Sequence, residues 1–244
     1  MNNKKVLLVL GASSDLGVSL IENVADNYDC VIAHYRRMSE KLEELQNRYK
    51  EKLICLKADF CSEKECEKMI EDIKAKGLTP TDIVHFSSSN AEQLRFHKQS
   101  WASFQRLIDT SLKSLVQVLT AFLPAMSKQK YGRIVIMLTS YTINMPPRYL
   151  SAYVTVKYAL LGLVKSLAVE YASKGITVNG VSPEMIETKF LADTPELIVK
   201  NNAEASPLGR NLVTDDVVPA IKFLLSDGAA CITGQNIAIT GGKF

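Results

Sequence analysis

The sequence is poor in the residue types that build metal sites and disulfide frameworks. Among 244 residues there are three histidines, at positions 34, 85 and 97, and five cysteines, at positions 30, 55, 61, 66 and 231. Neither set shows a metal-ligand spacing, so we expect no metal site. Because the cysteines are odd in number and scattered, they are typical of reduced thiols in a cytoplasmic protein.

Charge and long apolar runs are also scarce. The net charge is +3 and no long run of like charge occurs, which argues against nucleic acid as a partner. The first apolar run, Val6–Leu10, is too short for the apolar region of a signal peptide, and Gly11 after it is more typical of a turn. No apolar run approaches membrane-spanning length, so we expect no membrane partner.

What the chain does contain is a regular alternation of strand-like and helix-like patterns. Short apolar runs predict strands at 6–10, 30–35, 53–58, 82–86, 133–138, 176–181 and 236–240, and helical patterns lie at 16–27, 39–50, 63–75, 100–127, 152–173 and 214–226. The runs are nearly continuous in apolar character, as in strands buried on both faces. Strand–helix alternation predicts a parallel sheet with helices on both faces. With no linker or repeat in view, we predict a single doubly wound, Rossmann-type α/β domain over residues 1–244, with a sheet of about seven strands.

Two helical patterns, 112–126 and 152–172, are apolar around most of their circumference. A helix that covers one face of a sheet needs only one apolar stripe. The additional apolar surface favours a subunit interface, and hence a homo-oligomer. A deeply buried helix in a large domain would show the same pattern.

The first strand leads into a glycine-rich turn, "VLLVLGASSDLG". Gly11 can take the tight turn, and Gly17 permits close packing of the helix on the sheet. Ser13 and Ser14 place hydroxyl groups beside the free N–H groups of a helix N-terminus, an arrangement that favours a phosphate. The position of this turn after the first strand predicts a nucleotide site, although an ordinary strand-to-helix turn can carry the same glycines.

The end of the second strand indicates which nucleotide is bound. An NAD site usually places an acidic residue about 20 residues past the turn, whereas this chain has Arg36 and Arg37 in "AHYRRMSEK". Two guanidinium groups suit a ribose 2′-phosphate, which favours NADP over NAD; a solvated basic turn is the alternative. Asp59, after the third strand, could accept a hydrogen bond from an adenine amine or could cap the helix at 63–75.

Tyr153 and Lys157 lie one helical turn apart in "AYVTVKYALLGL" and share a helix face. A free phenol has a pKa near 10, and a nearby ammonium group favours the phenolate and lowers that pKa. The pair is therefore a candidate general acid with its activating lysine. Taken alone, such a pair is far more often a solvated surface pair.

Several motifs occur together and in order over nearly the whole chain: GASSDLG (11–17), Asp59, Ser140 thirteen residues before Tyr153, the Tyr-x3-Lys pair, ITVNGVSPEMIET (176–188), SPLGR (206–210) and ITGQNIAITGG (232–242). With these motifs the chain resembles the short-chain dehydrogenase/reductase family, and within it the 3-oxoacyl-[acyl-carrier-protein] reductase type. The resemblance implies that Tyr153 is the general acid in a carbonyl reduction. It also implies that Lys157 holds the nicotinamide ribose, and that Ser140 stabilises the substrate oxygen.

The resemblance assigns further positions as well. It implies that cofactor contacts come from Gly11, Ser13, Ser14, Leu16, Gly17, Arg36, Arg37, Asp59, Ser87, Tyr153, Lys157, Ile186 and Thr188. Ser111 aligns with the asparagine that helps to position a proton-relay water. The segment from about 188 to 207, punctuated by Pro195 and Pro207, corresponds to the family's substrate lid, which gates such sites. Family analogy also implies a tetramer.

The chain departs from the family pattern in four places. Asp15 replaces a glycine, and a carboxylate near a phosphate is unfavourable, although an aspartate at a helix N-terminus can also serve as a cap. The segment Ser87–Ser89 keeps small residues but lacks the family's amides, and Ser111 is shorter than the family's asparagine. Glu184 replaces a glycine, with loss of its conformational freedom. His85, at a strand end, is interpreted as a packed core residue.

Two classes of function follow from these observations. The first is a cytoplasmic, NADPH-dependent reductase that converts a ketone, such as a 3-oxoacyl thioester, to a hydroxyl; within it, an alcohol or polyol dehydrogenase of a specialised pathway is the alternative. The second is a non-catalytic nucleotide-binding module that acts as a partner subunit. The intact set of Ser140, Tyr153 and Lys157 favours the first class. The altered turn and relay position favour the second.

Overall fold

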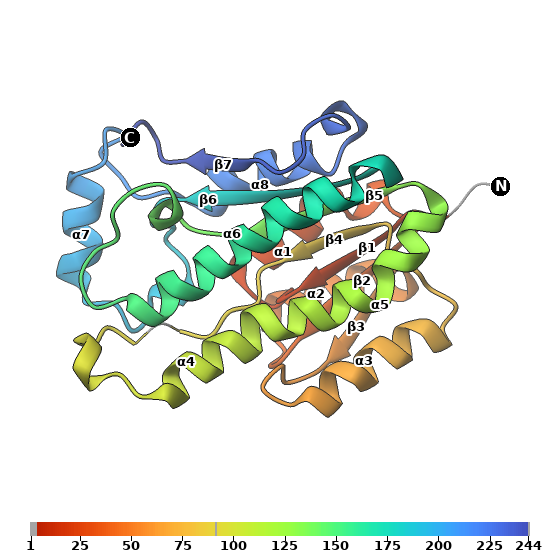
Figure 1. Cartoon of the computed structure of the whole chain (residues 1–244), viewed down its shortest axis with the longest axis horizontal. Coiled ribbons are helices and arrows are strands. Elements are labelled where there is room, and N and C mark those ends of the chain that lie inside the picture. Colours follow the sequence, from red (N-terminus) through yellow and green to blue (C-terminus); the bar gives the residue numbers. More distant parts are fainter. Residues whose placement is uncertain (1–3, 91, 244) are drawn as a thin grey trace.

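The computed structural model describes residues 4–90 and 92–243, and within them seven strands form one parallel sheet (Figure 1). The strands are β1 (Val6–Leu10), β2 (Cys30–Tyr35), β3 (Leu53–Lys57), β4 (Asp82–His85), β5 (Gly132–Met137), β6 (Ile176–Pro183) and β7 (Asn236–Ile239). Their order in the sheet is β3-β2-β1-β4-β5-β6-β7. The chain order therefore reverses between β1 and β4, and ligands bind at such a switch point in open α/β sheets.

Helices cover both faces of the sheet. One layer is made of α1 (Asp15–Val24), α2 (Glu40–Tyr49) and α8 (Thr214–Leu224), and the other of α3 (Glu63–Ala75), α5 (Ser114–Gln129) and α6 (Ser151–Tyr171). The short helix α7 (Glu196–Glu204) lies beyond the edge toward which the strands point, at the left in Figure 1. The predicted doubly wound Rossmann-type architecture is confirmed.

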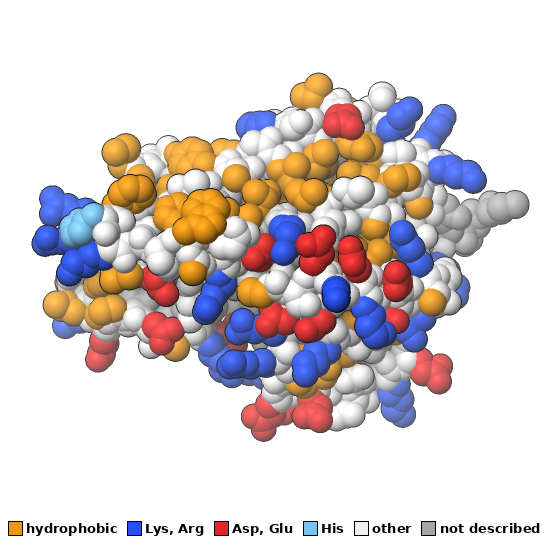
Figure 2. Space-filling view, turned by 60° about the horizontal axis from the view of Figure 1, so that its bottom comes forward, with side chains coloured by type: hydrophobic (Ala, Val, Ile, Leu, Met, Phe, Trp, Pro, Cys, Tyr) orange, Lys and Arg blue, Asp and Glu red, His pale blue; other side chains and the backbone are white. Residues whose placement is uncertain are grey.

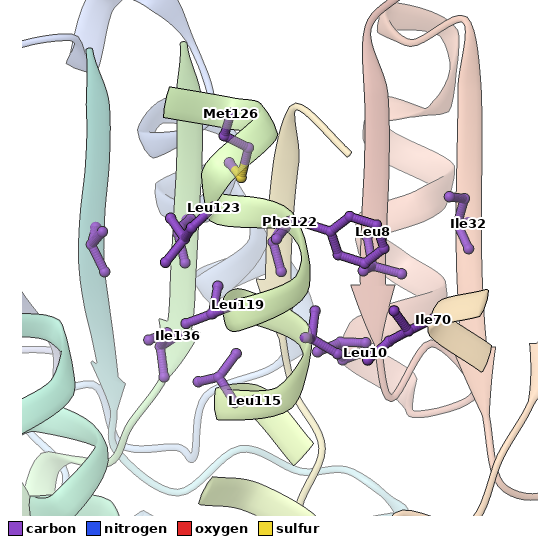
Figure 3. Packing of buried hydrophobic residues seen from close by; sticks show 14 of the residues in the cluster. Leu8, Leu10, Ile32, Ile70, Leu115, Leu119, Phe122, Leu123, Met126 and Ile136 are labelled. Atoms are coloured by element: carbon purple, nitrogen blue, oxygen red, sulfur yellow. The ribbon is translucent and has the colours of Figure 1, made fainter. Parts of the chain in front are cut away.

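The core on the α5 side of the sheet fixes how that layer sits over the central strands. Leu8 and Leu10 of β1 face the same side as Ile136 of β5, and Leu115 and Phe122 of α5 pack onto them (Figure 3). Burying each such side chain contributes about 1.5–3 kcal/mol relative to leaving it exposed. This packing places the beginning of α5 above the carboxyl ends of the central strands.

The two outer strands do not meet the expectation that every strand is buried on both faces. β3 and β7 form the edges of the sheet, and most of their residues are only half-buried. An edge strand has one neighbouring strand and less cover from the helices, so its apolar pattern reflects packing on one side. The inner strands β1, β4, β5 and β6 are buried throughout, as predicted.

The helix predicted at 100–127 is continuous but changes its winding in the middle. It begins as α4 (Trp101–Leu107), passes through a π-helical turn at Ile108–Lys113, and continues as α5. In this turn the Thr110 hydroxyl donates to the Arg106 carbonyl, and the Ser114 hydroxyl donates to the Thr110 carbonyl. Such side-chain bonds compete with the helical ladder. π-helical turns are frequent at functional sites, and Ser111 lies in this one.

The prediction that no segment reaches membrane-spanning length is wrong for α6 and the turn after it. Ser151–Lys174 is long and apolar enough by composition to cross a membrane, with a mean hydropathy of 1.4. In the fold, however, this helix lies along the sheet beside β6 (Figure 1). Its inner face, which includes Lys157, Leu160 and Val164, is buried in the domain. Its place in the core layer therefore explains the apolar residues of this inner face.

Candidate active site

The glycine-rich turn begins at the carboxyl end of β1. It places the N-terminus of α1 at the carboxyl ends of the parallel strands. Gly11 has a φ of +84°, and a Cβ there would lie 3.0 Å from the backbone nitrogen of Ser87. A Cβ on Gly17 would lie 2.7 Å from backbone atoms of Ala12. The Ser14 hydroxyl donates to the Gly11 carbonyl over 2.8 Å and accepts from the Gly17 N–H. This close-packed turn, with α1 behind it, fits a dinucleotide pyrophosphate.

His34 braces this turn, a role that the sequence did not reveal. The N–H of Gly11 donates to His34 Nδ1 over 3.1 Å, and His34 Nε2 donates to the Ala58 carbonyl over 3.0 Å. The ring also stacks on Phe60, with centroids 3.8 Å apart. Burial lowers the pKa of His34 to about 4, so the ring is neutral at neutral pH. The neutral imidazole thus links the ends of β1, β2 and β3.

This contact predicts a specific pH dependence of stability. The unfolded chain protonates His34 near pH 6.5 and the folded chain only near pH 4, so protonation favours the unfolded state as the pH falls between these values. We expect the stability advantage of the wild type over His34→Gln to shrink by about 2 kcal/mol from pH 7 to pH 5. Urea unfolding of both proteins at each pH measures it. A constant difference would show that His34 is not held neutral.

Asp15 does not cap α1, because Ser14 is the N-cap residue. Instead, Asp15 Oδ2 accepts a 2.7 Å hydrogen bond from the backbone N–H of Lys189, 174 residues further along the chain. Lys189 begins the short 3-10 turn at Lys189–Leu191, where the predicted lid starts. Asp15 therefore ties the glycine-rich turn to the lid while keeping a negative charge beside the candidate phosphate site.

The negative charge of Asp15 beside the candidate phosphate site should weaken cofactor binding, so its removal should strengthen binding. Asp15→Asn keeps an oxygen acceptor for Lys189 but removes the like charge near the pyrophosphate, an interaction on the order of 1–2 kcal/mol near a protein surface. We therefore expect the Kd for NADPH to fall about tenfold in low salt. Asp15→Gly removes both the charge and the hydrogen bond to Lys189. Comparison of the two variants therefore separates the effect of the charge from that of the hydrogen bond. Fluorescence titration measures both, and weaker binding by Asp15→Asn would contradict the electrostatic account.

Arg36 and Arg37 follow β2 directly, and both are exposed at the edge where the glycine-rich turn lies. Asp59 lies two residues after β3, and its Oδ1 accepts from the N–H of Cys61 over 2.9 Å. The reading of Asp59 as a helix cap is wrong, because Ser62 caps α3. An adenine contact by Asp59 stays a prediction.

Ser140, Tyr153 and Lys157 come together where β5 ends and α6 begins. Ser140 starts the 3-10 turn after β5, and its Oγ is buried without a hydrogen-bond partner in the described part of the chain. Lys157 is 4% exposed, and its Nζ donates to the Met137 carbonyl over 2.8 Å. The same Nζ lies 5.5 Å from the centroid of the Tyr153 ring. The structure thus places a phenol, an ammonium group and an unpartnered hydroxyl together at the carboxyl ends of the strands.

The electrostatics of the pair differ from the sequence expectation. Burial lowers the pKa of Lys157 to about 8. Burial also raises the pKa of Tyr153, and a hydrogen bond with Thr139 offsets only part of that rise. The expectation of a lowered phenol pKa is therefore not met, because the effect of burial is the largest of the causes. The Tyr153 proton is retained at neutral pH, which suits a general acid.

The remaining predicted residues also lie at the carboxyl ends of the strands. Ser87 follows β4 beside Gly11, and Ser111 lies in the π-helical turn; the hydroxyl oxygen of each is buried without a partner among residues 4–90 and 92–243. Ile186 forms an isolated parallel bridge with Leu212. Thr188 precedes the 3-10 turn that starts the lid. Leu16 and Ser13, on the turn itself, are half-buried.

The sequence analysis missed an ion pair between Lys243 and Glu184. Lys243 Nζ donates to Glu184 Oε1 over 2.8 Å and to Asn202 Oδ1, on α7, over 2.7 Å. The lysine comes 59 residues after the glutamate, and no local pattern links them. Burial and then the Glu184 carboxylate raise the pKa of Tyr141, next to Ser140, to about 12.

The concern that Glu184 loses a needed glycine conformation is not supported. Outside glycine, positive φ angles in the described residues occur at Lys50, Lys130 and Tyr149. The backbone at Glu184 therefore adopts a conformation open to any residue. The charge of Glu184, rather than its backbone, is what distinguishes this position.

Comparisons with known proteins agree with this arrangement. A protein-family profile described as enoyl-(acyl carrier protein) reductase matches residues 12–243. The chain is 31% identical to a 3-oxoacyl-[acyl-carrier-protein] reductase from Aquifex aeolicus, over 98% of this chain and 97% of that one. It is 30% identical to the corresponding reductase from Staphylococcus epidermidis, over 98% and 99%.

Among solved structures, the fold is similar to a gluconate 5-dehydrogenase from Burkholderia cenocepacia, in complex with NADP and tartrate. The TM-score is 0.87 at 19% identity, covering 98% of this chain and 94% of that one. At this identity the likeness concerns the fold alone. The family match over residues 12–243 and the similar fold agree with the Rossmann-type architecture predicted from the motifs. The chain therefore belongs to the short-chain dehydrogenase/reductase family and is an NAD(P)-dependent oxidoreductase.

Proposed function

We propose that this protein reduces a ketone with NADPH, and that its substrate is a 3-oxoacyl thioester. The observation that carries this proposal is the grouping of Ser140, Tyr153 and Lys157 at the end of β5, on the same sheet edge as the glycine-rich turn. The relatives that are 30–31% identical over the full chain are 3-oxoacyl-[acyl-carrier-protein] reductases. The structural neighbour from Burkholderia cenocepacia was solved with NADP.

The cofactor, when bound, supplies the hydride, and the chain supplies position and charge. The glycine-rich turn and α1 would hold the pyrophosphate, and Arg36 and Arg37 would pair with the 2′-phosphate. The unpartnered Ser140 hydroxyl donates to the substrate carbonyl oxygen and stabilises its developing charge. Tyr153 gives its proton to that oxygen, and the Lys157 ammonium then returns a proton to the phenolate.

The raised pKa of Tyr153 determines which form of the phenol is present at neutral pH. A phenol that keeps its proton at neutral pH is ready to act as the acid in reduction. Oxidation of an alcohol would require the deprotonated form, which burial disfavours. Because the same phenol serves as acid in one direction and as base in the other, the alcohol dehydrogenase alternative is tested with substrates.

An NADPH oxidation assay with three probes tests the proposal. The probes are the N-acetylcysteamine thioesters of acetoacetate and crotonate, and 5-keto-gluconate. They represent the ketone, enoyl and sugar-acid chemistries of the similar proteins. We expect turnover with the acetoacetyl thioester. Turnover with the crotonyl thioester alone would make the protein an enoyl reductase, and turnover with the keto acid alone would place it with the sugar-acid dehydrogenases.

We also propose that the protein acts in the cytoplasm, where its five free cysteines stay reduced.

We propose in addition that the protein forms a homo-oligomer through α5 and α6. Val116 on α5 and Tyr158 and Val169 on α6 are exposed in the single chain, and Val169 is 84% exposed. Figure 2 shows apolar side chains gathered on one face of the molecule. Sedimentation should show an oligomer that Val169→Glu weakens. A wild-type monomer would contradict this interface.

A further inference from the structure

Glu184 stands where the family has a glycine, and one of its two carboxylate oxygens has no partner. The side chain is 6% exposed. Its Oε1 accepts from Lys243 Nζ over 2.8 Å, whereas its Oε2 is buried without a hydrogen-bond partner within residues 4–90 and 92–243. A buried acceptor without a partner destabilises the folded chain, so a group of this kind calls for an explanation.

The sheet ladder places the Glu184 carboxylate on the same side as the turn that contains Ser140. The N–H of Glu184 donates to the Ile239 carbonyl over 2.9 Å, so the extended backbone of β6 continues through Glu184. Because side chains alternate along a strand, Glu184 lies on the same face as Ser182. The Ser182 hydroxyl lies 3.0 Å from that of Thr142, which belongs to the 3-10 turn that begins at Ser140. Glu184 therefore lies just beyond this contact, on the Ser140 side.

The lid helix α7 lies beyond the carboxyl ends of β6 and β7 (Figure 1) and reaches the same carboxylate. Lys243 Nζ, which pairs with Glu184, also donates to Asn202 Oδ1 on α7 over 2.7 Å. After burial, the Glu184 carboxylate is the next cause that raises the pKa of Tyr141, the residue after Ser140, so these two side chains lie near each other. The carboxylate thus lies between the Ser140 turn and the lid helix, where a ketone held by Ser140 would also lie.

From this placement we propose that Glu184 selects a ketone that carries a hydroxyl group near its carbonyl, by accepting a hydrogen bond from that hydroxyl at Oε2. The inference rests on the proposed reductase function and names the substrate class of the same site. For a 3-oxoacyl thioester, the hydroxyl lies on the acyl chain.

The charges at this position favour a neutral donor. Lys243 already balances the Glu184 carboxylate, so an ammonium group on the substrate would leave a buried charge without compensation. A hydroxyl supplies a proton without a charge. A methyl group in the same place would leave Oε2 unpaired when the substrate displaces solvent, and a site built to bind a hydroxyl rejects an analogue that lacks it.

Two pairs of isosteric ketones test the proposal: hydroxyacetone with 2-butanone, and 4-hydroxy-2-butanone with 2-pentanone. Within each pair a hydroxyl replaces a methyl group, on the first or the second carbon from the carbonyl. We expect the wild-type kcat/KM with NADPH to favour the hydroxylated ketone about 30-fold in at least one pair. Glu184→Ala should bring that ratio below about threefold, because the acceptor is gone. If Glu184→Ala fails to fold, Glu184→Gly, which restores the family residue, carries the test.

Glu187→Ala is the matched control. It removes the same charge from an exposed position three residues further along the chain, where Glu187 Oε1 already accepts from Asn211 Nδ2 over 3.1 Å. We expect this variant to change the rates for both ketones of a pair equally, so that their ratio stays at the wild-type value.

The complex with NADP⁺ separates this inference from the proposed function, because the oxidised cofactor cannot reduce a ketone. In this complex, thermal stabilisation should show about tenfold tighter binding of the hydroxylated ketone than of its isostere, and Glu184→Ala should abolish the difference. If this preference is found but no acetoacetyl thioester is reduced, the thioester assignment fails and the role of Glu184 stands.

Three results would overturn the role of Glu184. The first is equal binding and equal kcat/KM within both pairs in the wild type. The second is a ratio that survives in Glu184→Ala. The third is a loss in Glu184→Ala that is confined to the acetoacetyl N-acetylcysteamine thioester or to NADPH affinity, which would place an amide N–H of the carrier arm or of the cofactor at Oε2.

Discussion

Tyr153→Phe is expected to lower the turnover of a ketone substrate by about 10³-fold while leaving NADPH affinity within about twofold of wild type. The substitution removes a single hydroxyl, which is the proton source of the reaction in our account. The phenyl ring keeps its packing near Lys157, whose Nζ lies 5.5 Å from the centroid of the tyrosine ring. Steady-state kinetics and a fluorescence titration with NADPH measure the two quantities separately.

The same helix offers a matched control. Tyr158 lies five residues further along α6, on its exposed side, and Tyr158→Phe removes the same hydroxyl from an exposed ring. We expect this control to keep wild-type kinetics. If Tyr153→Phe keeps more than a tenth of wild-type turnover, then another group supplies the proton and the assigned role of Tyr153 is wrong. If its NADPH affinity also falls steeply, the residue serves binding rather than proton transfer.

Removing Arg36 and Arg37 together should weaken NADPH binding about 30-fold and leave NADH binding unchanged. Both guanidinium groups are exposed just after β2, so each charge-assisted contact with the 2′-phosphate is discounted to about 1 kcal/mol. NADH lacks that phosphate and should not sense the change. The ratio of the two dissociation constants, from parallel titrations, is therefore the quantity to measure.

Arg48→Ala/Lys174→Ala is the control, because it removes the same net charge from exposed positions at the ends of α2 and of the turn before β6. We expect it to change both affinities slightly and equally. An equal loss of NADPH and NADH binding in Arg36→Ala/Arg37→Ala would show that the arginines act through general charge. An NADH preference in the wild type would overturn the assignment of the phosphate site.

The sequence predicted the sheet well because each inner strand is a short apolar run and each helix follows it. VLLVL coincides with β1 (Val6–Leu10), and CVIAHY coincides with β2 (Cys30–Tyr35). The half-buried edges β3 and β7 were not distinguished from inner strands, because strand order depends on crossovers that no local run encodes.

The site was predicted where its residues belong to one turn or one helix, as for the glycine-rich turn and the Tyr153–Lys157 pair. It was not predicted where contacts join distant parts of the chain. The tie from Asp15 to Lys189 and the pair of Lys243 with Glu184 depend on the complete fold. The brace of His34 on Gly11 depends on the register of β1 and β2. The direction of the Tyr153 pKa shift likewise depends on burial, which the Tyr-x3-Lys spacing does not reveal.

The most direct test of the central claim is a single turnover with NADPH carrying deuterium at the transferable position of the nicotinamide. The enzyme is mixed with this cofactor and the acetoacetyl thioester, and the product is examined by mass spectrometry. Our account predicts one deuterium on the new carbinol carbon with wild type and none with Tyr153→Phe in the same time. Tight NADPH binding without label in the product from any of the three probes would contradict a reductase, and would favour the non-catalytic nucleotide-binding module.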